Sequence, residues 1–438
     1  MIRLALAFAL TLVAAGPLRA AVEIQEITSP GGINAWLVEE HSIPFVSLDI
    51  RFKGGASLDP AGKRGVSNLM TGLIEEGAGE LDARGFAEAR DALAASYDFD
   101  VWDDSMRVSA KFLTENRDEA VDLLRQALIN PRFDEDAVER VRAQVLSIIR
   151  SDATDPNTIA GQSFDAMAYG DHPYGSSRDG TLESVAALTR DDIVAANRAL
   201  LVRDRVYVGA SGDITAEELG LLLDKLLGDL PESNLPLTGP VDPDVHAGIT
   251  VVPFETPQSV VLFGHTGISR DDPEFFAAFV ANEVFGGNGR QSRLSNEVRE
   301  KRGLTYGVGT YLVNFDQADM LFGQMASAND RVAEAIEVVK SEWQNIASKG
   351  VTETELEEIK TYLTGAYPLR FDGNSRIARI LVGMQVTGLT PDYITTRNEQ
   401  LNAVTLDDVL RVAERLYQPG NLHFVVVGQP EGVSSTGQ

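Results

Sequence analysis

The segment spanning residues 65–77 (GVSNLMTGLIEEG) has the spacing of an amphipathic helix that could carry a metal site. Its apolar residues recur every three or four positions, and the adjacent stripe holds Asn68, Thr71 and Gly72. A zincin-type helix instead carries two His at i and i+4, with a Glu beside them as general base. Asn, Thr and Gly are poor zinc ligands and cannot act as a base. The segment therefore predicts a helix without that chemistry.

Other candidate metal ligands are scattered along the chain. There is no Cys, which excludes disulfides and thiolate metal sites. Glu75 and Glu76 are most simply the solvated end of the predicted helix. No two His lie at ligand spacing, so each is expected to be structural or solvated: His41, His172, His246, His265 and His423.

Length and charge limit the class of protein. The chain has 438 residues, which is too long for one compact core, so two or more domains are expected. Its net charge is −27 at pH 7. An anion this strong is repelled by nucleic acid and by anionic membranes, so the sequence argues against both as partners.

Residues 1–21 have the pattern of a secretory signal peptide. Arg3 precedes an apolar run over residues 4–15, and small residues follow at Ala20 and Ala21, near which cleavage is expected. The apolar run is short for a membrane span. We therefore expect a periplasmic or otherwise exported protein.

Two pairs of landmarks indicate an internal duplication. An Asp-Pro step, which suits a helix N-cap and first position, occurs at 59–60 and again 213 residues later at 272–273. Thr189 and Thr405 each open a helix with an acid three residues on, which resembles a capping box. These two positions are 216 residues apart, so both pairs give nearly the same offset.

Strands grouped in hairpins and followed by long helices predict an α+β fold. We expect two homologous α/β-sandwich-like domains from the duplication, each a mostly antiparallel sheet with helices packed on one face. The first domain covers residues 22–230 and the second covers 248–438, and a linker rich in Pro, Gly, Asp and Ser joins them at 231–247. In the second domain, residues 306–313 are expected to pair with 320–326 as a hairpin.

Three segments resemble a known family. They are residues 44–67 (PFVSLDIRFKGGASLDPAGKRGVS), 292–308 (SRLSNEVREKRGLTYGV) and 130–133 (NPRF). Through them the chain resembles the pitrilysin/insulinase superfamily of zinc metallopeptidases, in the short two-domain form that includes mitochondrial processing peptidase. The resemblance covers essentially the whole mature chain.

The resemblance also shows what this chain lacks. It places the first His, the Glu and the second His of the family's HxxEH motif at Asn68, Thr71 and Gly72. The family's third zinc ligand is a Glu on a later helix, and the corresponding residues 144–150 (QVLSIIR) contain no acid. We therefore expect no metal or other cofactor in this chain.

Active members of the family use an Arg and a Tyr of the C-terminal domain to contact the substrate backbone, and these match Arg299 and Tyr306. A Tyr hydroxyl can donate to the oxyanion of a tetrahedral intermediate, and an Arg can hold substrate carbonyls. The alternatives are a solvated charge at Arg299 and a core-packed strand aromatic at Tyr306. A Gly-rich loop, which helps to admit substrate in related subunits or simply ends a helix here, comprises Gly286, Gly287, Asn288 and Gly289.

The resemblance implies a zinc-less subunit of a heterodimeric metallopeptidase. A paralogous partner with intact HxxEH is expected to supply zinc and the general base, and this chain is expected to supply Arg299 and Tyr306 to bind peptide substrates. In isolation the chain is expected to be inactive. The competing interpretation is a catalytically inert structural or peptide-binding homologue.

Overall fold

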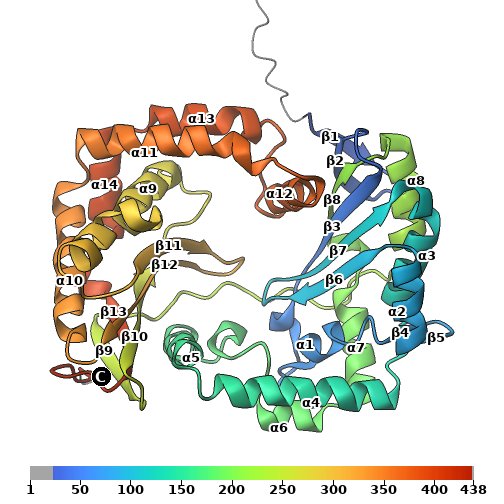
Figure 1. Ribbon diagram of the computed structural model, residues 1–438, viewed down its shortest axis with the longest axis horizontal. Coiled ribbons are helices and arrows are strands. Elements are labelled where there is room, and N and C mark those ends of the chain that lie inside the picture. Colours follow the sequence, from blue (N-terminus) through green and yellow to red (C-terminus); the bar gives the residue numbers. More distant parts are fainter. Residues whose placement is uncertain (1–22, 437–438) are drawn as a thin grey trace, which may run out of the picture.

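Alternating apolar residues build two β-sheets, which lie on either side of a central opening (Figure 1). The computed structural model describes residues 23–436, so the predicted signal peptide lies outside the described residues. None of the helices in the described part of the chain is both long and apolar enough to cross a membrane.

The first sheet has six strands in the order β1-β2-β8-β3-β7-β6. Its central strand β3 buries Val46, Leu48, Ile50 and Phe52, and only the β2–β8 pair is parallel. A separate two-stranded ladder pairs β4 with β5. The strands of this half are β1 (Gln25–Thr28), β2 (Asn34–Glu39), β3 (Phe45–Lys53), β4 (Gly77–Ala78), β5 (Leu81–Asp82), β6 (Ser96–Val101), β7 (Ser105–Leu113) and β8 (Val206–Gly212).

The second sheet repeats the first. Its order is β11-β12-β10-β13-β9, and the single parallel pair, β9–β13, occupies the place of β2–β8. The predicted duplication into two mostly antiparallel sheets is therefore confirmed. The strands are β9 (Gly248–Pro253), β10 (Gln258–Thr266), β11 (Val308–Asn314), β12 (Asp319–Ala328) and β13 (His423–Gly428).

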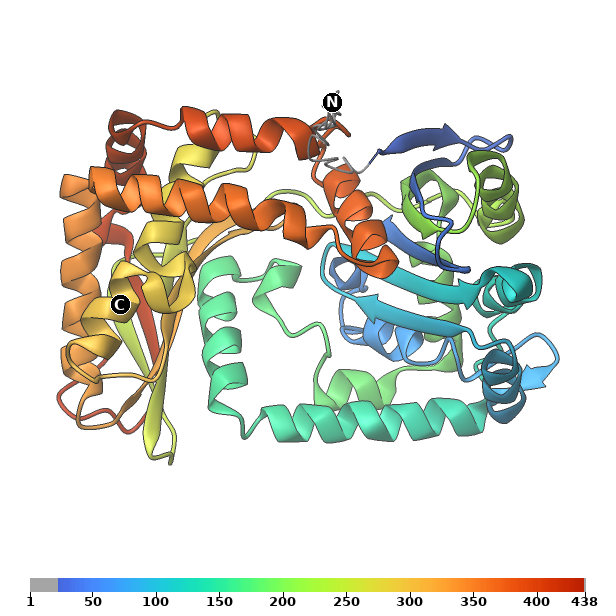
Figure 2. The same ribbon diagram turned by 45° about the horizontal axis from the view of Figure 1, so that its top comes forward.

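Helices of each half cover one face of its own sheet and enclose an apolar core (Figure 2). The predicted capping boxes form at equivalent helices, where Thr189 exchanges hydrogen bonds with Asp192 and Thr405 with Asp408. In the first half the helices are α1 (Val66–Thr71), α2 (Ala83–Ala92), α3 (Arg117–Ile129), α4 (Glu135–Asp152), α5 (Pro156–Tyr169), α6 (Leu182–Ala187), α7 (Arg190–Leu200) and α8 (Ala216–Leu227). In the second half they are α9 (Phe275–Asn282), α10 (Val332–Lys349), α11 (Glu353–Ala366), α12 (Asn374–Val386), α13 (Tyr393–Ala403) and α14 (Leu406–Leu416).

The Asp-Pro steps do not begin the helices as predicted. The first helices of the two halves begin later, at Val66 and Phe275. Asp59 instead accepts hydrogen bonds from the backbone N–H groups of Gly65 (2.8 Å) and Ser67 (3.2 Å). Asp59 therefore accepts hydrogen bonds from N–H groups at the start of α1, as an N-cap side chain would, although it lies in the preceding loop.

The second face of the N-terminal sheet is covered by α12, a helix of the opposite half (Figure 1). Gln385 donates to the Val208 carbonyl at 2.8 Å, and the hydroxyl groups of Ser47 and Ser375 lie 2.9 Å apart. Gly209 of β8 permits this approach, because a Cβ there would overlap the carbonyl oxygen of Ala378.

The exchange is reciprocal. Helix α5 of the first half packs against β10 and β13 of the second sheet, where Phe164 meets Phe322 with ring centroids 5.0 Å apart. The first residue of α12 follows that of α5 by 218 residues, close to the offset of the duplication. Equivalent helices have therefore changed places, which the sequence patterns did not predict.

The turns of two equivalent hairpins also meet. The backbone N–H of Asp316, in the β11–β12 turn, donates to Asp104 Oδ2 of the β6–β7 turn at 3.0 Å. These residues are 212 positions apart. The N–H of Gln317 donates to the Tyr174 hydroxyl at 3.2 Å, and Lys53 pairs with Asp316 at 3.2 Å. Together with the exchanged helices, these contacts fix the two halves relative to one another.

Replacing Leu381 on α12 with Ala should weaken this connection. The side chain is fully buried between α12 and the N-terminal sheet, so its loss leaves a cavity. We expect the free energy of unfolding, measured by urea denaturation, to fall by about 2–5 kcal/mol. The matched control is Leu369→Ala, because Leu369 precedes α12 and is 74% exposed. Equal, small effects of both substitutions would contradict the proposed anchoring role of α12.

The stability of α5 should depend on pH through Asp165. Burial, with a smaller contribution from the charge of Asp103, raises the pKa of Asp165 from 3.8 to about 7. The folded chain then binds this proton more tightly than the unfolded chain, so this contribution to stability falls as pH rises from 3.8 to about 7. The shift corresponds to at most about 4 kcal/mol, at 1.36 kcal/mol per pKa unit.

Asp165→Asn should therefore be more stable than the unsubstituted chain at pH 8, and the difference should vanish near pH 4. The melting temperatures of both proteins across this range measure the effect. Glu183→Gln, at an exposed position on α6, is a control with the same charge change. A constant difference between the Asp165 variant and the unsubstituted chain at all pH values would show that Asp165 is ionised throughout.

Candidate functional site

The helix that should carry the zinc motif is short and its polar positions are already engaged. Helix α1 has six residues and ends at Thr71, with Gly72 as its C-cap. The Thr71 hydroxyl donates to the Ser67 carbonyl at 2.8 Å within the helix, and Thr71 is buried. Asn68 is partly buried and Gly72 is exposed. The helix predicted over residues 65–77 therefore stops at the position of the missing second His.

The residues packed around α1 also lack the features of a zinc site. A Cβ at Gly72 would lie 3.2 Å from Val141 Cγ1 of α4, which is tighter than an ordinary contact. The segment of α4 that should provide the third ligand, residues 144–150, has no acidic residue. Among residues 23–436, no group of three or more His, Asp or Glu side chains is arranged to hold a metal ion. The side chains present do not fit the zinc of this fold.

Glu75 and Glu76 are not the solvated helix end that the sequence predicted. Glu75 accepts a hydrogen bond from Arg90 at 2.9 Å, and burial raises the pKa of its carboxyl group despite this pairing. Glu76 pairs with Arg140 of α4. Both acids therefore connect the segment that follows α1 to the neighbouring helices. Periodicity alone could not show this, because the chain turns after Thr71.

Histidines occupy unrelated environments. His265 is buried beside Trp343 in the second core, and burial lowers the pKa of its imidazole. His41 is exposed between Glu39 (3.0 Å) and Asp213 (2.8 Å), and hydrogen bonds to both acids raise its pKa. These are the structural and solvated roles that the sequence predicted.

Arg299 has one acidic partner within its charged run, and its side chain is 25% exposed. It belongs to η7 (Ser295–Glu300), a π-helical segment, where its guanidinium lies 3.4 Å from the Glu300 carboxylate. The neighbouring Arg302 is held by Glu297, both through its carboxylate and through its carbonyl oxygen, at 2.7 Å. Arg299 therefore remains available to a group outside the segment.

Tyr306 lies in a loop before β11, and the predicted strand begins two residues later, at Val308. Its side chain is 84% exposed, so the alternative of a core-packed strand aromatic is wrong. The loop itself is held firmly, because the Thr305 hydroxyl contacts the carbonyl oxygens of Gly307 and Ala326 at 2.7 Å each. An aromatic ring is thus presented to solvent from a fixed backbone.

The predicted Gly-rich loop divides into two parts. Gly286 and Gly287 end η5 (Glu283–Gly287), a π-helical extension of α9, and both permit close packing. A Cβ at Gly286 would overlap the Thr310 hydroxyl on β11, and one at Gly287 would lie 2.8 Å from Glu283 Oε1. Asn288 and Gly289 follow at the surface, and Gly289 adopts φ +52°. Close packing therefore accounts for glycine at positions 286 and 287, and no contact with a substrate is needed to explain it.

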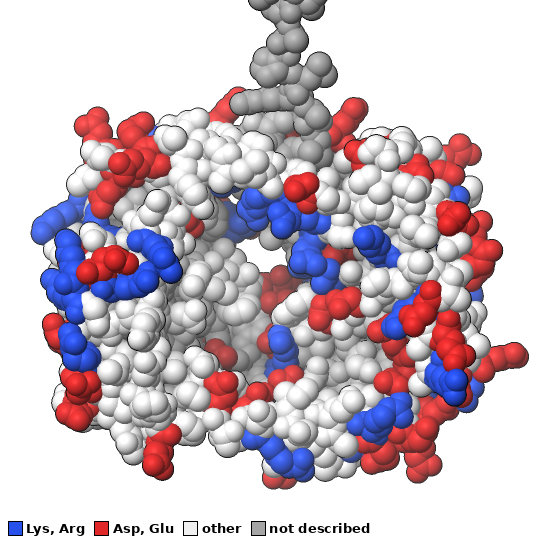
Figure 3. Space-filling view, in the orientation of Figure 1, with Lys and Arg blue, Asp and Glu red and all other residues white. Residues whose placement is uncertain are grey.

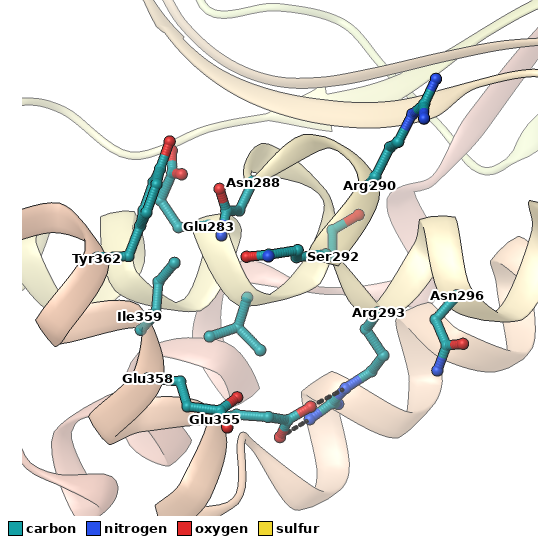
Figure 4. Close-up of a pocket in the computed structure, with 12 residues that line it drawn as sticks. Glu283, Asn288, Arg290, Ser292, Arg293, Asn296, Glu355, Glu358, Ile359 and Tyr362 are labelled. Atoms are coloured by element: carbon teal, nitrogen blue, oxygen red, sulfur yellow. Dashed lines mark hydrogen bonds and ion pairs between the residues drawn. The ribbon is translucent and has the colours of Figure 1, made fainter. Parts of the chain in front are cut away.

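A cavity of about 580 Å³ adjoins this loop, between η5, η7 and α11 (Figure 4). Arg293, a residue of the family-like segment 292–308, makes two parallel bonds to Glu355, at 3.0 and 2.7 Å. The dashed lines in Figure 4 mark this pair, which holds α11 against the segment that carries Arg299. Arg293 therefore has a structural role.

A second groove lies beside Tyr306 and has a volume of about 530 Å³. Residues 307–309 and Tyr311 of the second half form one side of it, and Asn157, Ala160 and Gly161 of α5 form the other. Sequence reasoning missed this groove, because it exists only through the helix exchange.

With this geometry in view, the chain can be compared with known proteins. Residues 35–181 match the family described as insulinase (peptidase family M16), and residues 187–363 match the peptidase M16 inactive domain. The chain belongs to peptidase family M16. The two matches are separated by residues 182–186 of α6, so both family regions contribute to the first half.

Similar proteins occur in bacteria. The chain is 25% identical to the non-peptidase homolog YmxG of Helicobacter pylori, over 89% of this chain and 90% of the relative. It is 24% identical to the uncharacterized zinc protease YmxG of Bacillus subtilis, over 90% and 96% of the two chains. A crystal structure of a peptidase M16 inactive domain from Pseudomonas fluorescens shares the fold, with a TM-score of 0.87 and 24% identity over 94% and 99% of the two chains.

The zinc content of the purified chain tests the interpretation of α1. Dialysis against zinc chloride and then against zinc-free buffer should leave well below one zinc per chain by elemental analysis, because the motif positions offer no imidazole or carboxylate. An M16 protein with an intact HxxEH motif, treated in parallel, should retain one. Stoichiometric zinc that is lost on Asn68→Ala would show that the α1 site binds metal.

Proposed function

We propose that this chain is the non-zinc-binding subunit of a heterodimeric M16 metallopeptidase. The observation that carries the proposal is the contrast between the two halves. The residues at the family's zinc positions are chemically unsuitable for a metal, whereas Tyr306 is 84% exposed on a fixed loop. Because Tyr306 is the residue that the family resemblance places against the substrate backbone, its exposure leaves the hydroxyl group accessible for that contact.

In the proposed complex, Tyr306 donates its hydroxyl proton to the oxyanion that forms when a peptide bond is attacked. Arg299 holds a substrate carbonyl and so orients the scissile bond. A paralogous partner with an intact HxxEH motif supplies zinc, the attacking water and the general base. This chain alone has no such base at Thr71, so it is inactive without the partner.

Peptide substrates would bind in extended form. Strand β6 is one edge of the first sheet and β11 is one edge of the second, so each has one side of its backbone unpaired within its sheet. A peptide added to such an edge gains main-chain hydrogen bonds that are indifferent to side chains. This mode supports a broad range of sequences. The Asn288 and Gly289 surface next to the 580 Å³ cavity is proposed as a further wall of the substrate path.

The proposed location is the periplasm or another exported compartment, supported by the signal-peptide pattern of residues 1–21. The net charge of −27 disfavours nucleic acid and anionic membrane surfaces as partners.

A catalytically inert structural or peptide-binding role is the second candidate. One observation favours it: the Helicobacter pylori relative bears the name non-peptidase homolog. In that case Arg299 and Tyr306 would contribute to peptide binding without affecting any rate.

Kinetics of the reconstituted pair separate these candidates. Cleavage of a quenched fluorescent peptide should require both subunits, and Tyr306→Phe in this chain should lower kcat by about 10²–10³-fold, the effect of losing one oxyanion donor. Tyr207→Phe on β8 is a matched control, because it removes a hydroxyl group from a partly exposed tyrosine of the first half that has no assigned role.

An unchanged kcat in the Tyr306 variant, with both subunits present, would refute the proposed division of labour. A higher KM at constant kcat would assign Tyr306 to binding alone. Activity of this chain without any partner would refute the proposal entirely.

A further inference from the structure

A small pocket in the second half gathers arginines that are distant in the sequence. It has a volume of about 240 Å³ and lies between α9, β11, α13 and η8 (Tyr367–Arg370). Its lining includes three arginines and one acid: Arg270, Arg370, Arg397 and Glu283.

The three guanidinium groups lack counterions. None of them forms an ion pair with a carboxylate among residues 23–436, and Arg270 Nε is buried without a hydrogen-bond partner. Arg397 is only 6% exposed, and burial lowers the pKa of its guanidinium. Burial also raises the pKa of Glu283, so its carboxyl group is less readily ionised and is a weaker counterion.

Aromatic rings hold two of these arginines in place, and Arg397 also donates through Nη1 to the Leu363 carbonyl at 3.4 Å and to Asn398 Oδ1 at 3.1 Å. The Arg270 guanidinium lies 5.3 Å from the ring centroid of Phe275 and 5.9 Å from that of Tyr393. The Arg397 guanidinium lies 4.3 Å from the Tyr367 ring. Stacking fixes the planes of the guanidinium groups but leaves N–H donors free for an oxygen ligand.

The pocket arginines differ in this respect from the buried Arg107, which pairs with Asp49 at 2.7 Å and Asp100 at 3.2 Å. Figure 3 shows basic side chains gathered at the upper edge of the central opening, where Figure 1 places α12. A concentrated positive potential there attracts anions.

We infer that this pocket binds a carboxylate group of the peptide substrate. Arginine is the side chain best suited to pair with a carboxylate through two parallel hydrogen bonds, and the surrounding rings accept the adjacent apolar atoms. The pocket is smaller than the usual range for whole ligands, about 300–1,000 Å³, so it accommodates one residue of a peptide.

The neighbouring elements support a peptide as the source. Tyr311 of the edge strand β11 lines both this pocket and the groove beside Tyr306. A peptide paired with β11 therefore runs from the neighbourhood of Tyr306 to the three arginines. The inference deepens the proposed function and rests on it for the identity of the ligand as substrate. The carboxylate itself can come from the C-terminus or from an Asp or Glu side chain.

Fluorescence anisotropy of the isolated full-length chain with labelled peptides tests the inference. The probe is a ten-residue Ala/Ser/Val/Leu peptide, labelled at its N-terminus with an uncharged dye, that has either a free C-terminal carboxylate, a C-terminal amide, or a C-terminal amide with one internal Glu. We expect at least one carboxylate-bearing peptide to bind about tenfold or more tightly than the uncharged amide, and its identity reveals the source.

Two substitutions then locate the effect. Arg370→Gln, at an exposed position, should abolish the preference for carboxylate, and Arg270→Gln should do the same. Arg198→Gln on α7 makes the same charge change far from the pocket and should preserve the preference. Equal binding of all three peptides, or a preference that survives both pocket substitutions, would overturn the inference. Because no partner subunit is present, failure here is distinct from failure of the Tyr306 kinetics.

Discussion

The exchange of α5 and α12 between the two halves determines the shape of this molecule. Each sheet has one face covered by its own helices and the other covered by a helix from the opposite half. Neither half can bury both faces of its sheet alone, so the apolar surface that stabilises each half also joins it to the other. The relative placement of α1, β6, β11 and the Tyr306 loop depends on this connection.

The α1 region and the proposed Arg299–Tyr306 surface differ on this common frame. On α1, the Thr71 hydroxyl donates within the helix and α4 packs close to Gly72. The positions that align with the family's zinc motif therefore make ordinary contacts within the protein. In the second half, the side chains of Arg293 and Thr305 form hydrogen bonds that hold the backbone around Arg299 and Tyr306 in place. Supporting contacts of this kind are expected where a side chain must be positioned for another molecule.

Local patterns predicted most of the secondary structure but not its assembly. The capping boxes at Thr189 and Thr405, the strand alternation of β3 and the duplication are encoded within short segments. Neither α5 nor α12 was among the predicted helices, and the periodicity of a helix cannot specify which sheet it covers. The end of α1 was also missed, because Leu73 and Ile74 stay fully buried after the helix stops and so continue its apolar pattern.

The reciprocal exchange has the form of a domain-swapped dimer of two half-length chains, made continuous by the segment at residues 231–247, which contains no helix or strand. Equivalent turns meet at Asp104 and Asp316, as they would across the twofold axis of such a dimer. The covalent connection then serves chiefly to keep the halves at high effective concentration. The contacts between the halves are noncovalent, and linker residues add to them, since the Thr238 hydroxyl donates to the Ser57 carbonyl at 3.1 Å and the Val241 N–H to the Gln317 carbonyl at 3.0 Å. A single cut in the linker would leave the exchanged helices in place, so the two fragments are expected to stay assembled.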